Sequence, residues 1–132
     1  MSKRKKIITV ILTIILVLGV FGVKYGIDFM YYEKVMPTVT IGSVDIASID
    51  NGTYTGGFDA KIIAAEVEVT IESGKILDIK LLKHKYEKGG PATAIVDDII
   101  RAQSLQVDVV SGATNSSKTI LKSVENALTN SN

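Results

Sequence analysis

The sequence predicts an α+β fold: a small antiparallel sheet with two main helices, preceded by one N-terminal transmembrane helix. Three observations predict it. An uninterrupted apolar run covers residues 7–23. Apolar and polar side chains alternate with a period of two across residues 65–82, as in half-buried strands. Helical spacing of the apolar residues follows in residues 92–103 and again in residues 115–128. Strands followed by helices in this order are typical of α+β domains.

The apolar run follows four consecutive basic residues, Lys3 to Lys6. Its 17 residues would span about 26 Å as a helix, close to the roughly 30 Å core of a bilayer. No small-residue cleavage site follows, and the next residues are rich in tyrosine and phenylalanine, which suits an aromatic belt at a membrane interface. We therefore expect a retained anchor, with a cleaved signal peptide and a buried core helix as alternatives.

The basic cluster also predicts the orientation, because positively charged flanks stay in the cytoplasm. Residues 1–6 form the cytoplasmic N-terminus and residues 7–23 the transmembrane anchor. Residues 24–40 are a juxtamembrane linker, and residues 41–132 are an extracytoplasmic domain. The expected location is the cell membrane, with a single pass.

Composition excludes several classes of function. The chain contains no cysteine, which rules out disulfides, thiolate metal sites and thiol nucleophiles. From Val35 onward there are 9 basic and 12 acidic residues. A mildly acidic domain gives no basis for a nucleic-acid partner.

The sheet is predicted from three β-prone segments. Residues 53–58 follow an Asp-Asn-Gly turn and form the first strand. Residues 65–72 and 76–82 alternate apolar and polar side chains around a turn at Ser73-Gly74, which predicts an antiparallel hairpin.

The remaining elements follow a polar loop at residues 83–90. Residues 92–103 carry their apolar side chains on one helical face, and the proline just before them suits a first turn. Residues 107–110 predict a short strand, and the last helix is expected to start near residues 115–117.

Small and hydroxyl-bearing residues gather where the short strand should meet the last helix. The first turn of a helix has unpaired N–H groups and a positive dipole end, which favour a phosphate. Gly112 and Ala113 would let a ligand approach the backbone closely, and Thr114 presents a hydroxyl beside it. A plain helix cap made by the same hydroxyl residues is the alternative.

This segment resembles the flavinylation motif of the FMN-binding domain family. That family includes the FMN-carrying subunits of the sodium-pumping quinone reductase and of related ion-translocating ferredoxin oxidoreductases. The family pattern is an Asp, two residues, a Ser or Thr, and then Gly-Ala-Thr, with hydroxyl residues beyond. The matching residues are Asp108, Ser111, Gly112, Ala113 and Thr114, followed by Ser116 and Ser117. The resemblance extends over roughly residues 44–128.

The resemblance implies that Thr114 carries FMN as a covalent phosphoester. A Mg-dependent flavin transferase would make this bond from FAD and release AMP. Asp108 would be recognised by the transferase, while Gly112 and Ala113 keep the approach to Thr114 open. Ser111, Ser116 and Ser117 would complete the cofactor site. No catalytic residue and no metal ligand is expected within the chain.

His84 and Gly56 are weaker candidates for contact with the flavin. His84 is the only histidine, and a surface position at a strand end is its alternative interpretation. Gly56 would let the flavin ring lie against the backbone, or it would mark a β-bulge. Tyr54 and Tyr86 are large enough to stack on the ring, although Tyr54 equally suits packing in the sheet.

These observations predict a membrane-anchored electron-transfer flavoprotein. Its expected partners are the flavin transferase, the membrane and an unidentified redox partner. The alternatives are an anchored interaction module of the same fold without flavin, and a domain separated from a larger reductase.

Overall fold

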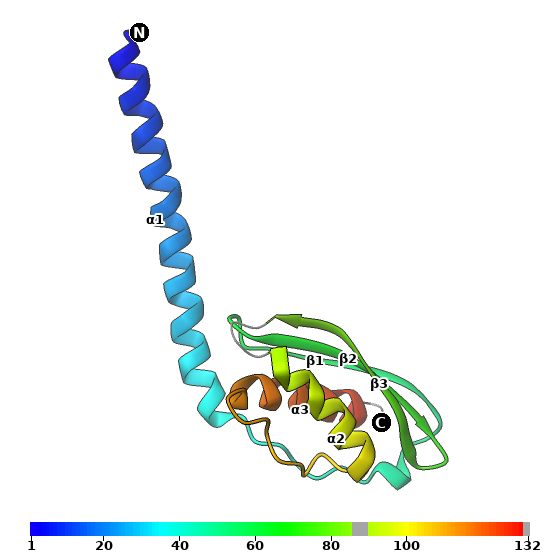
Figure 1. Ribbon diagram of the computed structural model, residues 1–132. Helices are drawn as coiled ribbons and strands as arrows, with labels where there is room; N and C mark the ends of the chain where they lie inside the picture. The colour runs from blue at the N-terminus through cyan, green and yellow to red at the C-terminus, as the bar shows by residue number, and fades with distance from the viewer. Residues whose placement is uncertain (86–89, 131–132) are drawn as a thin grey trace.

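The computed structural model describes residues 1–85 and 90–130. A long N-terminal helix stands on a small domain in which helices cover one face of a three-stranded sheet (Figure 1). The predicted α+β fold is confirmed.

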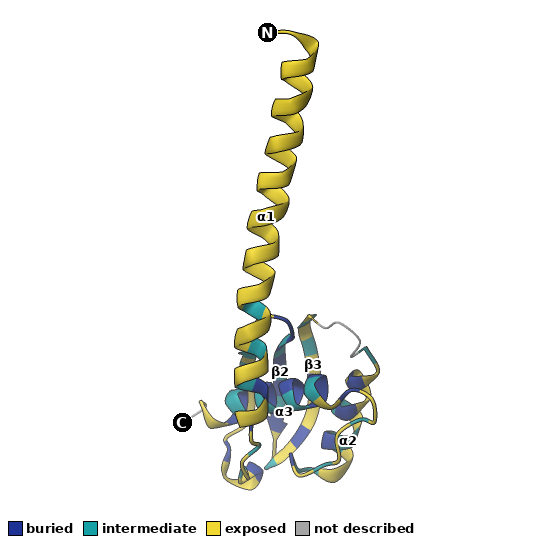
Figure 2. Cartoon of the chain, turned by 90° about the vertical axis from the view of Figure 1, so that its left-hand side faces the viewer, coloured by how far each residue is buried: buried dark blue, intermediate teal, exposed yellow. Residues whose placement is uncertain are grey.

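The long helix α1 spans Lys3–Val35. Among the described residues it is the helix that is long and apolar enough to cross a membrane, and none of its apolar stretch is buried within the protein (Figure 2). A buried core helix, one of the alternatives, is therefore excluded. Residues 24–35, assigned to the linker, continue the same helix, which ends in a 3₁₀ turn, η1, at Met36–Thr38.

The sheet contains β1 (Gly52–Asp59), β2 (Ala64–Glu72) and β3 (Lys75–Lys85) in the order β1-β2-β3, with both pairs antiparallel. Alternate residues of β2 are buried, because one face of the strand packs on the core and the other faces solvent. A 3₁₀ turn, η2 (Ile46–Ser48), precedes the sheet.

Two α-helices follow the sheet. A 3₁₀ turn, η3 (Gly90–Ala94), leads into α2 (Ile95–Ala102), so the predicted helix at residues 92–103 has a 3₁₀ first turn. The last helix, α3 (Thr114–Thr129), lies across β1 and β2 (Figure 1). The main core lies between this helix and the sheet. Its most deeply buried large side chains are Val67, Val69, Ile71, Ile76, Ile95, Ile99, Ile120, Val124 and Leu128.

The prediction of a short strand at residues 107–110 is wrong. These residues form no strand, and the described sheet ends at β3. The reason is visible at Val110, whose N–H donates to the Ser117 hydroxyl at 3.0 Å instead of to a neighbouring strand. The segment is therefore a connection from α2 to α3, anchored by a side chain.

A second, smaller core fixes the end of α1 on the domain. Met36, Val39 and Ala60 are buried together, and Tyr32 and Phe58 pack against them. Polar contacts continue this attachment along the chain: Lys122 Nζ donates to the Thr40 carbonyl at 3.2 Å, and Gln106 Nε2 donates to the Ile41 and Gly42 carbonyls at 3.4 and 3.3 Å. The connection between helix and domain is thus packed against the domain rather than extended into solvent.

Candidate functional site

A tight turn presents the start of α3. The Ala113 N–H donates to the Val110 carbonyl at 2.9 Å, which closes a four-residue turn. Gly112 occupies the third position with φ of +79°, a backbone conformation that type II turns require and that side chains disfavour. No atom lies within 4 Å of the place where a Cβ would stand on Gly112. Backbone conformation, rather than crowding, therefore favours glycine here.

Ser117 holds this turn against the helix. Its hydroxyl accepts from the Val110 N–H at 3.0 Å and donates to the Ala113 carbonyl at 2.7 Å, and its side chain is fully buried. Ser116 is also buried. Both serines were predicted to help bind the cofactor, but the structure places them on the inner side of the helix, where Ser117 has a structural role.

Thr114 is the first residue of α3 and is exposed. The N-cap is Ala113, and within the described residues no side chain makes a capping hydrogen bond there. The interpretation of this segment as a plain hydroxyl cap is therefore wrong. No capping side chain in the described part of the chain accepts a hydrogen bond from the N–H groups of the first turn. The positive end of the helix dipole lies beside Thr114, the first residue of the helix.

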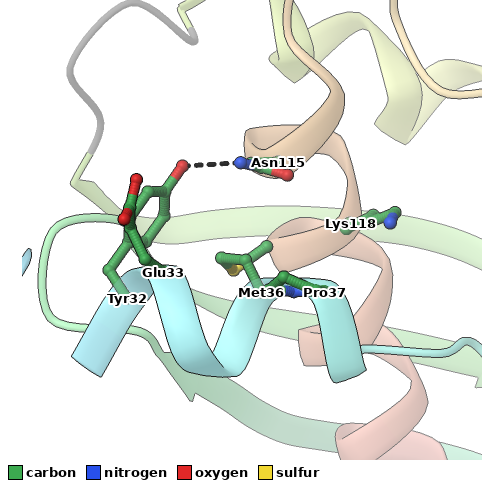
Figure 3. Close-up of a pocket in the computed structure, with 6 residues that line it drawn as sticks. All are labelled: Tyr32, Glu33, Met36, Pro37, Asn115 and Lys118. Atoms are coloured by element: carbon green, nitrogen blue, oxygen red, sulfur yellow. Dashed lines mark hydrogen bonds between the residues drawn. The ribbon is translucent and has the colours of Figure 1, made fainter. Parts of the chain in front are cut away.

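A cavity of about 390 Å³ opens between the end of α1 and the first turn of α3, where Asn115, the residue after Thr114, lines it (Figure 3). Asn115 Nδ2 donates to the Tyr32 hydroxyl at 2.7 Å across it. Lys118 lies on the other side of the cavity from Tyr32 and one helical turn after Thr114, so the two α3 residues share a helix face. Lys118 forms no ion pair with any residue that the structure describes. The lining residues are Tyr32, Glu33, Met36, Pro37, Asn115 and Lys118.

Sequence reasoning had missed the part that α1 plays in this cavity. From the sequence, Tyr32 belongs only to the stretch rich in tyrosine and phenylalanine that suits a membrane interface. Its spacing from Tyr25 and Phe29 gave a usable signal, because residues at i, i+4 and i+7 share one face of a helix. The structure shows that Tyr32, at the end of this face, contacts the domain.

Asp108 and Ser111 lie on the surface of the connection that leads to α3. Asp108 is exposed and lines a separate hollow of about 440 Å³ together with Arg101 and Asp98, which form an ion pair at 3.3 Å. Ser111 is exposed beside Gly112. An enzyme approaching Thr114 from solvent would therefore find both side chains accessible.

Gly56 lies away from Thr114. A Cβ on Gly56 would stand 2.2 Å from the Ala127 nitrogen and 2.5 Å from the Ser123 carbonyl oxygen. These α3 residues are nine to thirteen positions after Thr114, roughly 14–20 Å along the helix axis. The pairing of β1 with β2 shows no register shift at Gly56, so Gly56 does not form a bulge. Its contacts on α3 also place it away from Thr114. Its role is to let α3 approach the sheet closely.

His84 is half-buried near the end of β3, opposite Ala65 of β2. Burial lowers the pKa of its imidazole below the ordinary value of 6.5, because the charged form loses hydration. Tyr54 packs against the main core and donates its hydroxyl to the Asp50 carbonyl at 2.6 Å, as the sheet-packing interpretation expects. Tyr86 lies outside the described residues.

The chemistry of the site fits a phosphate-bearing cofactor. An exposed hydroxyl on Thr114, first-turn N–H groups and the Lys118 ammonium are brought together on one end of α3, and Gly112 leaves the space beside them open. These groups can hold an anion and present an oxygen atom for its attachment.

Comparison with families of known proteins agrees with this geometry. The model of the FMN-binding domain family matches residues 63–129, which include β2, β3, α2, the turn at Gly112 and all of α3. Comparison with curated proteins found no match. The match covers half of the chain and includes the turn and the α3 part of the candidate site, and we conclude that the chain belongs to the FMN-binding domain family.

Proposed function

We propose that this protein is a membrane-anchored electron carrier that holds FMN covalently on Thr114, outside the cytoplasm. The observation that carries the proposal is the exposed Thr114 hydroxyl at the start of a helix that no side chain caps within the described residues. Membership of an FMN-binding family supports the flavin, and the geometry of Thr114 supports the point of attachment.

Thr114 would act as the nucleophile of its own modification. Its oxygen would attack the FMN phosphorus of FAD, so that a new O–P bond forms as the bond from that phosphorus to the bridging pyrophosphate oxygen breaks. AMP leaves with the bridging oxygen, and a base of the flavin transferase takes the hydroxyl proton. No electrons are exchanged in this step. Asp108 and Ser111, both exposed on the approach to Thr114, are proposed as surfaces that the transferase recognises.

The start of α3 would then stabilise the attached phosphodiester, which keeps one negative charge. A helix N-terminus contributes about 0.3–1 kcal/mol to such an anion. Lys118, on the same helix face as Thr114, adds a positive charge within reach.

Covalent attachment suits an exported protein. Even a nanomolar dissociation constant, about −12 kcal/mol, would not retain a cofactor at great dilution. The flavin supplies the electron chemistry when bound, while the protein supplies position and surroundings. The chain is therefore proposed as a carrier between redox partners that remain to be identified.

The anchor sets the location in this proposal. Helix α1 is long and apolar enough to cross a membrane, and four basic residues precede its apolar run. By the positive-inside rule the N-terminus lies in the cytoplasm and the FMN domain lies outside it.

The test is the intact mass of the full-length protein produced together with a flavin transferase. The wild type should gain the mass of one FMN less one water and absorb near 450 nm, and Thr114→Val should show neither change. Thr129→Val is the matched control, because Thr129 is an exposed threonine at the other end of the same helix; this variant should gain the flavin like the wild type.

An unmodified, colourless wild-type protein under these conditions would contradict the proposal and favour an interaction module of the same fold. A full mass gain in Thr114→Val would contradict the assignment of the attachment site.

A further inference from the structure

The cavity at the start of α3 is shared between the domain and the end of the anchor helix. Tyr32, Met36 and Pro37 come from the α1–η1 end, and Asn115 and Lys118 come from α3 (Figure 3). Its volume of about 390 Å³ lies within the range of pockets that hold small ligands, about 300–1,000 Å³.

The wall that α1 contributes is held in place from two sides. Tyr32 packs against the second core of Met36, Val39 and Ala60, and its hydroxyl accepts a hydrogen bond from Asn115 at 2.7 Å. Met36 is only 3% exposed. Tyr32 therefore presents its ring at a fixed position next to the residue that follows Thr114.

The chemistry of this cavity matches a flat aromatic ring joined to a phosphate. The Tyr32 ring offers an aromatic surface for stacking, and the Asn115 side chain offers an amide donor and acceptor for the polar edge of a heterocycle. Lys118 lies on the opposite side, next to the phosphate end that Thr114 would carry. Glu33, which is exposed, also lines the cavity.

We propose that Tyr32 and Asn115 are positioning residues for the flavin, so that the anchor helix forms one wall of the cofactor site. The inference rests on the proposed function, because it requires FMN on Thr114. It goes further by assigning to the membrane-proximal helix a part in binding that lies outside the region matched by the family, residues 63–129. The domain and its anchor then form one cofactor site.

The experiment measures how well iodide quenches the flavin emission of full-length protein in detergent, after intact mass has established that each variant carries one flavin. Tyr32→Ala should increase the iodide quenching constant by about twofold or more, because it removes one wall of a pocket of a kind that buries about 70–90% of a ligand. Tyr32→Phe keeps the aromatic wall and should retain the protection of the wild type. Tyr31→Ala is the control, since Tyr31 is the preceding tyrosine of α1, is 44% exposed and does not line the cavity.

Three results would overturn the inference while leaving the proposed function intact, provided that all variants carry the flavin. In the first, the iodide quenching constant of Tyr32→Ala equals that of the wild type. In the second, the quenching constant of Tyr32→Phe equals that of Tyr32→Ala. This result would assign the effect to the Tyr32–Asn115 hydrogen bond alone. In the third, the quenching constant of Tyr31→Ala equals that of Tyr32→Ala. This result would assign the increased quenching to general loosening of the helix. A wild-type protein without the flavin mass would overturn the proposed function and this inference together.

Discussion

At the scale of single residues, two glycines help to position α3 for different physical reasons. Gly112 adopts a positive φ in open space, so a side chain there would strain the backbone without a clash. Gly56 touches the backbone of α3, so a side chain there would collide with main-chain atoms that cannot move away alone. The first glycine shapes the turn before Thr114, and the second sets the distance between α3 and the sheet.

Alanine substitutions should separate these two roles. Gly112→Ala should lower the free energy of unfolding by about 1–2 kcal/mol, the cost of a left-handed conformation for a residue with a side chain. Gly56→Ala should cost about 3 kcal/mol or more, since it overpacks the contact between helix and sheet. Urea unfolding of the two purified variants measures both values. Equal losses, or a larger loss at Gly112, would contradict the different roles.

His84 should make stability depend on pH. Its folded-state pKa lies below its unfolded value of about 6.5, so the unfolded chain binds the proton more readily. The stability that His84 supports is therefore fully present above pH 6.5 and is lost as the pH falls through the lowered folded-state pKa.

Thermal melts between about pH 7.5 and pH 5 measure this dependence, since imidazole titrates within that range. The wild type should lose more stability over the range than His84→Gln, in which nothing titrates at this position. An identical dependence in the two proteins would show that His84 does not contribute to it.

At the scale of elements, the sequence predicts the strands in which apolar and polar side chains alternate, because the alternation follows directly from packing on one face. The hairpin of β2 and β3 was predicted because alternate side chains, such as Val67 and Val69, are buried on one face. The strand expected at residues 107–110 was not formed, because the partner of the Val110 N–H is the hydroxyl of Ser117. Nothing in local β-propensity reveals that a side chain seven residues away supplies the hydrogen bond.

Gln103 is a second side chain that replaces strand pairing. It has a φ of +50°, and its side-chain amide accepts from the Ile76 N–H at 2.7 Å and donates to the Ile76 carbonyl at 2.8 Å. The amide thus pairs with the edge of β3 as a neighbouring strand would. Since 27 residues separate the two partners, periodicity within a short window could not predict this contact.

Ser117 should matter for stability more than an ordinary serine. Ser117→Ala leaves the Val110 N–H without its acceptor in a partly buried place, which should cost about 1–3 kcal/mol. Ser43→Ala is the control, because Ser43 is exposed and such surface changes usually stay within about 0.5 kcal/mol. Chemical denaturation compares the two variants. A loss at Ser117 no larger than the loss at Ser43 would contradict its role in holding the turn before α3.

At the scale of the whole molecule, the site was only half predictable. Gly112, Ala113 and Thr114 are predicted as candidate site residues because they are adjacent in the sequence and carry a motif. The contact of Tyr32 with Asn115 could not be predicted, because the two residues are 83 positions apart and only the folded chain brings them together. The linker assignment likewise missed that α1 continues to Val35, although its aromatic side chains follow helical spacing and their rings lie 6.2–6.3 Å apart.

The packed end of α1 also fixes the height of the site above the proposed membrane. Nine residues separate Val23, the end of the apolar run, from Tyr32, which corresponds to about 14 Å along a helix. The headgroup region on each side of a bilayer is roughly 5–8 Å thick. The start of α3 would therefore lie close to the membrane surface, where a membrane-bound redox partner can reach it.

Locating the flavin within the chain tests the proposed attachment to Thr114 most directly. Full-length protein isolated from membranes that contain an active flavin transferase is digested with trypsin, which should release residues 102–118 as one peptide between Arg101 and the cleavage after Lys118. If Thr114 carries the flavin, this peptide has the added mass of FMN less one water, and fragmentation assigns that mass to Thr114. A flavin mass on another residue, or an unmodified peptide from a protein that has flavin absorbance, would contradict this attachment.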